Sequence, residues 1–94
     1  MGSQLCPLEI PAEVAAGGSV NCDHLHNKYL YMEADAFTAT VAIQGSVDGD
    51  NWQDLLTGVA AGDITAIPQP VRFVRANTTA YTSGTPVGYL IGEL

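Results

Sequence analysis

Positive charge is scarce in this chain, which has three Lys or Arg residues against ten Asp or Glu and a formal net charge of −7 at pH 7. Binding to nucleic acid depends on clustered Lys and Arg that release counterions from phosphate. Lys28, Arg72 and Arg75 are too few to form such a cluster, so we expect no nucleic-acid partner. The surplus of acids favours solubility and contact with a basic surface.

Long apolar runs and targeting signals are also missing. No stretch approaches the roughly 18 apolar residues of a membrane helix, and MGSQLCPLEI has neither the basic region nor the apolar core of a secretory signal. We therefore expect no membrane partner and synthesis in the cytoplasm. The two cysteines, Cys6 and Cys22, could pair in an oxidising compartment, but without a signal they are more simply two reduced thiols.

The composition favours one small all-β domain. Only 14% of the 94 residues are charged, and Thr, Ala, Gly and Val are plentiful. A β-sandwich of this size has a marginal core because small domains expose much of their surface. Since no disulfide or metal site is evident, oligomerisation is the remaining common source of stability, and we expect a homo-oligomer.

The clearest strand signal covers residues 37–47, where apolar and polar side chains alternate with a period of two. Asp48-Gly49 then predicts a tight turn and a return strand starting near Trp52, which we expect to lie in the core. Further strands are predicted around residues 22–33, 64–67, 71–82 and 86–94. The pattern predicts a small antiparallel β-sandwich, jelly-roll-like, with six to eight short strands and no helix.

The first 19 residues differ from the rest because their apolar residues show no clear period. Pro7, Pro11, Gly17 and Gly18 exclude a long helix. We expect residues 1–19 to form an extended arm and residues 20–94 to form the sandwich domain.

The sequence DGDNWQD gathers Asp48, Asp50, Asn51 and Asp54, and such oxygen ligands suit calcium. The EF-hand spacing fails, however, because Trp52 stands where a ligand is needed and no Glu occupies the twelfth position. Since Asp and Asn also favour tight turns, we interpret the segment as a turn.

The segment CDHLH would place Cys22, His24 and His26 on one side of a strand. They could hold zinc only with a fourth ligand, for which Cys6 is the one candidate. We favour a polar strand face or a subunit contact, and we expect neither a metal nor any other cofactor.

Catalysis is not indicated, because no G-x-S-x-G elbow or similar motif brings Ser, His and acidic residues together. We expect a protein that is not an enzyme. Excess apolar residues are more informative, because contiguous apolar surface usually marks an interface. They occur in the arm and in the last strand, and the predicted partner-binding residues are Leu5, Leu8, Ile10, Val14, Tyr89 and Ile91.

Two segments, IQGSVDGDNWQDL and PVRFVRANTTAYTSGT, resemble a pairing of the form S-x-D-G-x-x-W with R-[FY]-[VI]-R. That pairing recurs in galactose-binding-like sandwiches and in short virion proteins of tailed bacteriophages. The chain lacks the length for the ligand-binding loops of the sugar-binding family, so it looks more like small head decoration (cement) proteins. The matching residues are Ser46, Asp48, Gly49, Trp52, Arg72, Phe73, Val74 and Arg75.

The resemblance implies a structural protein on the exterior of a phage capsid, with the major capsid protein as partner and a homotrimer as the assembled state. Such a protein is made in the cytoplasm of the host. The alternative is a carbohydrate-binding module of a phage tail or host-recognition protein, in which Trp52, Tyr81 or Tyr89 stacks on sugar.

Overall fold

The computed structural model describes residues 2–94, and over this range it contains strands, turns and loops but no helix. It therefore offers no helix that could cross a membrane within those residues. The predicted all-β fold is confirmed, with nine strands rather than six to eight. They are β1 (Ser3–Leu8), β2 (Ala15–Ala16), β3 (Val20–Asn21), β4 (His26–Met32), β5 (Phe37–Ser46), β6 (Gln53–Leu56), β7 (Ile64–Ala66), β8 (Phe73–Gly84) and β9 (Gly88–Glu93).

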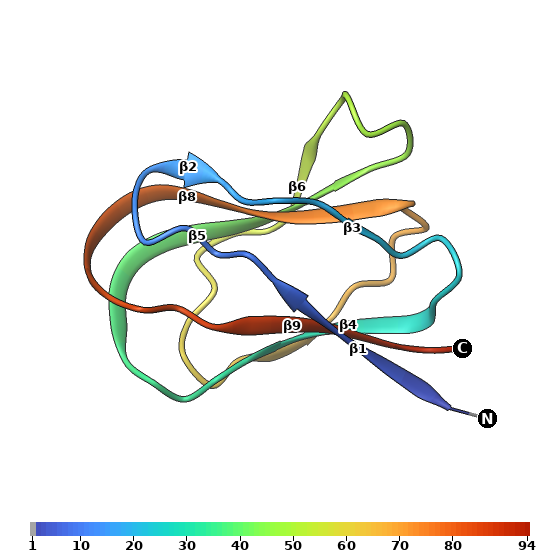
Figure 1. The fold of residues 1–94 in the computed structure, drawn as a ribbon, viewed down its shortest axis with the longest axis horizontal. Helices are drawn as coiled ribbons and strands as arrows, with labels where there is room; N and C mark the ends of the chain where they lie inside the picture. The colour runs from blue at the N-terminus through green and yellow to red at the C-terminus, as the bar shows by residue number, and fades with distance from the viewer. Residues whose placement is uncertain (1) are drawn as a thin grey trace.

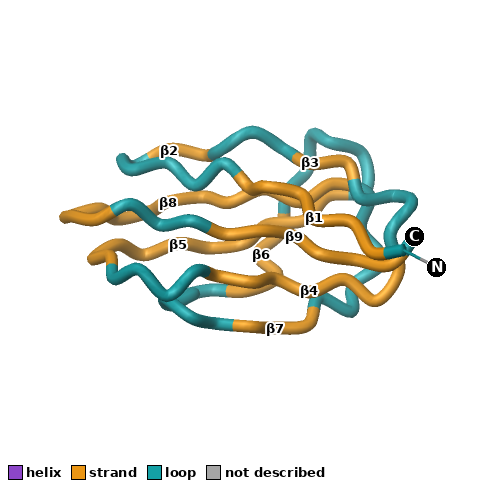
Figure 2. The backbone as a smooth tube through the Cα atoms, turned by 60° about the horizontal axis from the view of Figure 1, so that its bottom comes forward, coloured by secondary structure: helices purple, strands orange, loops and turns teal. Residues whose placement is uncertain are grey.

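The strands form two antiparallel sheets that face each other as two layers (Figure 1). Sheet A has the order β1-β9-β4-β7, and sheet B has the order β2-β8-β5-β6, with the short β3 also paired to β8. If β3 is left aside, each sheet has four strands, and strands that follow one another along the chain mostly lie in opposite sheets. This is the arrangement of a jelly roll. Figure 2 shows that loops and turns alone connect the strands and that β2 and β7 lie at opposite margins of the molecule.

The core forms between the sheets because alternate residues of each long strand point inward. In β5, Val41 and Ile43 are fully buried, which confirms the predicted face. In β4 and β9, Leu30 and Leu90 are fully buried from the opposite side. Gly45 continues the inner face of β5, where an added Cβ would lie 2.7 Å from the Leu55 side chain.

The N-terminal segment lies within the sandwich, so the expected arm outside it is wrong. Residues 3–8 pair with β9 along the edge of sheet A, where Pro7 is tolerated because an edge strand leaves some N–H groups unpaired. The chain then crosses to sheet B, where Thr78 donates a hydrogen bond to the Pro11 carbonyl at 2.8 Å. Gly17 permits this crossing because its backbone lies so close to the Glu9 carbonyl that any Cβ would collide with it.

Two local predictions also need correction. Residues 22–25 form a turn instead of a strand, with Leu25 N–H donating to the Cys22 carbonyl at 3.0 Å. Trp52 does not belong to the buried core; it is only partly buried, and the Arg75 guanidinium carbon lies 4.2 Å from its ring centroid. The indole therefore packs under a cation outside the core, because the residue precedes β6 by one position and points away from sheet A.

Candidate interaction surface

The outer face of sheet A carries two complete rows of apolar and aromatic side chains. Strand register places one row across the four strands as Leu5, Ile91, Tyr29 and Ala66, and the next as Pro7, Tyr89, Tyr31 and Ile64. Side chains in register on one face of a sheet are direct neighbours. We name these eight residues the tyrosine face.

The tyrosine face is accessible over much of its area. Ile64 exposes 69% of its surface and Leu5 exposes 56%, both on edge strands. Tyr31 is 36% exposed, and Tyr29, Tyr89 and Ile91 are partly exposed. Exposed apolar residues are common singly, but a contiguous group across a whole sheet is typical of an interaction surface.

The centre of the face is ordered by a pair of aromatic rings. Tyr31 and Tyr89 lie opposite each other on β4 and β9, with ring centroids 6.2 Å apart and planes 20° from parallel. The Tyr89 hydroxyl donates a hydrogen bond of 3.0 Å to Glu33 Oε1. That bond and the Glu33 charge raise the pKa of Tyr89 above its ordinary value.

Two glutamates stand at the ends of the central strands. Glu33 continues the outer alternation of Tyr29 and Tyr31, and its backbone N–H bonds to the Val87 carbonyl at 2.9 Å. At the other end, Glu93 accepts a hydrogen bond of 2.9 Å from the side chain of Asn27. Asn27 has φ of 51° and lies where the β4–β9 register shifts, which places its amide beside the carboxylate.

The predicted partner-binding residues separate into two groups in the structure. Leu5, Tyr89 and Ile91 come together on the tyrosine face. Leu8 and Ile10 do not, because they are 6% and 9% exposed and belong to the core cluster; their prediction as partner contacts is corrected. A sixth candidate, Val14, is 68% exposed but lies in the connection between β1 and β2, away from the others.

Sequence reasoning missed the other five of the eight residues of the face. Tyr29 and Tyr31 alternate with the buried Leu30 and Met32, so β4 is apolar on both sides. That double-sided pattern was a usable signal, and it also occurs in β9. Ile64 gave no comparable signal because β7 is only three residues long.

The outer face of sheet B has a different chemistry. Arg75 Nε donates to Gln44 Oε1 at 2.8 Å, and Gln44 Nε2 donates to Asp54 Oδ1 at 2.9 Å. With the Arg75–Trp52 stack, this chain of contacts ties β5, β6 and β8 together by their polar groups. These polar side chains of sheet B therefore form hydrogen bonds with one another.

The acidic segment after β5 forms the predicted turn. Asp48 Oδ1 accepts hydrogen bonds of 2.9 Å from the backbone N–H groups of Asn51 and Asp50, and Gly49 has φ of 82°. These bonds, with that of Asn51 the largest contributor, hold the pKa of Asp48 well below its usual range. Ser46 Oγ completes the turn by accepting from Gly49 N–H at 2.8 Å.

The candidate zinc ligands are dispersed. Cys22 is buried with 1% exposure, whereas His24 and His26 are exposed, and His24 Nε2 lies 2.7 Å from Gln4 Oε1. Both cysteines are free and buried, and burial raises the pKa of the Cys22 thiol. Among residues 2–94, no group of three His, Cys, Asp or Glu side chains is placed to hold a metal ion.

Several hollows mark the surface, and one of them borders the tyrosine face at Tyr29 and Ala66, next to Lys28. The one beside β2 is about 370 Å³ and is lined by Glu9, Glu13 and small or apolar neighbours, without a His, Cys or Ser. Its two carboxylates could act as general bases, but no nucleophilic side chain lies beside them. The tyrosine face differs from these hollows in covering all four strands of sheet A, and we take it as the candidate binding surface.

Comparison with known proteins identified no relative: no protein family, curated protein or solved structure matches this chain.

Proposed function

We propose that this chain is a structural protein of a tailed-phage virion, which attaches to the exterior of the capsid through its tyrosine face and reinforces it. The phage assignment is supported by the resemblance of residues 40–85 to short virion proteins. The attachment is supported by one structural observation, the eight apolar and aromatic residues that cover all four strands of sheet A. The major capsid protein is the proposed partner.

Binding energy in this proposal comes from apolar side chains that the fold leaves in water. Full burial of a side chain such as Ile64 or Leu5 contributes about 1.5–3 kcal/mol before the costs of association. A few such residues give only modest affinity. A homotrimer, as the resemblance implies, would engage three neighbouring sites at once and raise the avidity without further contacts.

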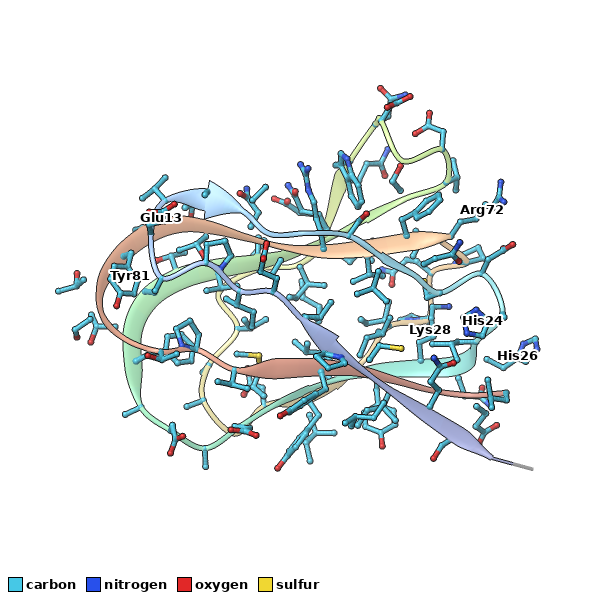
Figure 3. The ribbon with its side chains drawn as sticks, viewed as in Figure 1. Glu13, His24, His26, Lys28, Arg72 and Tyr81 are labelled. Carbon is cyan, nitrogen blue, oxygen red and sulfur yellow. The ribbon has the colours of Figure 1, made fainter. Side chains whose placement is uncertain are left out.

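A carbohydrate-binding role is less well supported by the positions of the aromatic residues. Trp52 lies on the sheet B side under Arg75, and Tyr89 lies on sheet A. Tyr81 lies at the end of the sandwich opposite His24 and His26 (Figure 3), where its hydroxyl donates to the Gly84 carbonyl. These three residues cannot form one sugar platform. Tyr31 and Tyr89 turn their ring faces toward each other at 6.2 Å, which leaves no space for a sugar ring between them.

Co-sedimentation with purified heads tests the proposal. Ile64→Asp places a charge on the tyrosine face, and Val47→Asp places the same charge on the β5–β6 connection, where the valine is 60% exposed. We expect wild type and Val47→Asp to pellet with heads at a fixed ratio to the major capsid protein, and Ile64→Asp to lose at least about tenfold in affinity. Equal binding by all three proteins would refute attachment through this face.

A further inference from the structure

The charges around the tyrosine face restrict what can dock on it. On the central strand pair, Glu33 stands beside the row of Tyr31 and Tyr89, and Glu93 stands beside Ile91 at the opposite end. The backbone partner of Glu33 is Val87, just before β9, and Glu93 ends β9 six residues later, so the backbone positions of the two glutamates lie about 20 Å apart along the strand direction. Both acids keep at least one carboxylate oxygen free of the hydrogen bonds described above.

Among the described residues, one strong base lies near these acids: Lys28 lines a hollow with Tyr29 and Ala66 at the edge of the tyrosine face. It lies at the end of the sandwich (Figure 3), where it also lines a hollow with Cys22, Leu25 and Val71. Arg72 contacts Asp23 at 3.6 Å at the same end, and Arg75 lies on sheet B. His26 is opposite Glu93 in register.

The two carboxylates disfavour a second copy of the chain as the occupant. Two copies that stack their sheet A faces with aligned strands can be related by a two-fold axis parallel or perpendicular to the strands. The first arrangement places Glu33 over Glu33 and Glu93 over Glu93 of the other copy, and the second places Glu33 over Glu93. Both put like charges together in a partly desolvated interface, which costs affinity. The negative charge of phospholipid and nucleic-acid surfaces is equally unsuited.

We infer that the tyrosine face docks on a protein surface that has an apolar centre and Lys or Arg side chains at two points about 20 Å apart, matching Glu33 and Glu93. This inference rests on the proposed function for the identity of the partner, and it adds the chemistry by which the partner is recognised. The apolar rows supply affinity, and the paired carboxylates select the partner and its orientation.

The experiment compares three proteins at pH 8, where imidazole groups are ordinarily neutral. They are wild type, Glu33→Gln/Glu93→Gln and the control Asp50→Asn/Asp54→Asn, which removes the same charge from the β5–β6 region. The amide introduced by Glu33→Gln retains an oxygen that can accept the Tyr89 hydroxyl hydrogen bond. Affinity for heads is measured from about 50 to 500 mM NaCl, a range over which surface charges become screened.

A pair of synthetic peptides provides a probe that does not depend on phage heads. Both are 20-residue helices with a leucine face, and they differ only at two positions 14 residues apart on that side of the helix, about 21 Å along its axis, which hold Lys in one peptide and Glu in the other. Binding is followed by the fluorescence of a dye on the peptide.

We expect the Glu33→Gln/Glu93→Gln variant to bind heads roughly 5–20-fold more weakly at low salt and to lose the salt dependence that wild type and control retain. We also expect wild type to prefer the Lys peptide. Head binding with the same salt dependence in all three proteins would overturn the inference and leave the proposed function intact. Preference for the Lys peptide without head binding would support the inference and reject the capsid as partner, and equal affinity for both peptides would count against the inference.

Discussion

The two sheets have similar strands, but their outer faces present different side chains to water. On sheet B, Gln44, Asp54 and Arg75 form a hydrogen-bonded chain, and Thr38 and Thr40 continue the polar face of β5. On sheet A, the equivalent positions hold tyrosine, leucine and isoleucine. Both sheets already contribute an apolar inner face to the core. The second apolar face of sheet A therefore exceeds what folding requires, and we attribute it to binding.

The largest expected effect separates the inner and outer faces of one strand. Leu8→Ala should lower the free energy of unfolding by about 2–5 kcal/mol because it opens a cavity in the core. Leu5→Ala, three residues earlier on β1 but 56% exposed, should change it by less than about 1 kcal/mol. Urea denaturation measures both. If the two variants were equally stable, residues 3–8 would not be part of the sandwich.

Trp52 tests the account of sheet B. Because the indole lies outside the core under Arg75, Trp52→Ala should cost about 0.5–2 kcal/mol, the range of a cation–π contact, and less than the 3–5 kcal/mol typical of a buried tryptophan. Capsid binding should be unchanged. If Trp52→Ala lowered the free energy of unfolding by more than about 3 kcal/mol, measured by heat or urea, the assignment of Trp52 outside the core would be wrong.

Surface hydrophobicity should distinguish the two faces without a partner. Leu5→Thr/Ile64→Thr removes the two most exposed large hydrophobic residues of the tyrosine face and should elute clearly earlier from a hydrophobic interaction column. Val47→Thr removes one exposed valine that has no such neighbours and should barely shift the elution. Stability should change by no more than about 0.5 kcal/mol in either protein. If the elution shifted by the same amount per apolar residue removed in both variants, the face would not act as a contiguous patch.

The smallest effect concerns the turn at the end of sheet B. The folded pKa of Asp48 lies below its unfolded value, so the carboxylate stabilises the fold above the ordinary Asp pKa of about 3.9, and this contribution is lost as the pH falls through the folded pKa. The melting temperature of Asp48→Asn should therefore fall below that of wild type near neutral pH, and the gap should narrow below about pH 4. A gap that stayed constant down to pH 2 would show that charge has no role in the turn.

The sequence predicts those parts of the structure that depend on local signals better than those that depend on distant strand pairing. The alternation of apolar and polar residues predicted the inner residues of β5, and Asp48-Gly49 predicted the turn, because both signals are local. The segment Ser3–Leu8 was misassigned because its partner, β9, lies 80 to 90 residues further along the chain and because a Pro on an edge strand resembles a strand break in the sequence. Trp52 was misplaced because nothing local reveals that Arg75 lies over its ring. Three of the eight residues of the tyrosine face were predicted from β1 and β9, and the other five required the register of the four strands against one another.

Hydroxyl-radical footprinting of the chain bound to phage heads tests the central claim most directly, since it reports the accessibility of both outer faces in one sample. Tyrosine and tryptophan side chains on the two sheets serve as reporters. We expect oxidation of Tyr31 and Tyr89 to fall several-fold on binding, while Trp52 on sheet B is oxidised as in the free protein. Protection of Trp52 with unchanged oxidation of Tyr31 and Tyr89 would contradict the account and assign attachment to sheet B.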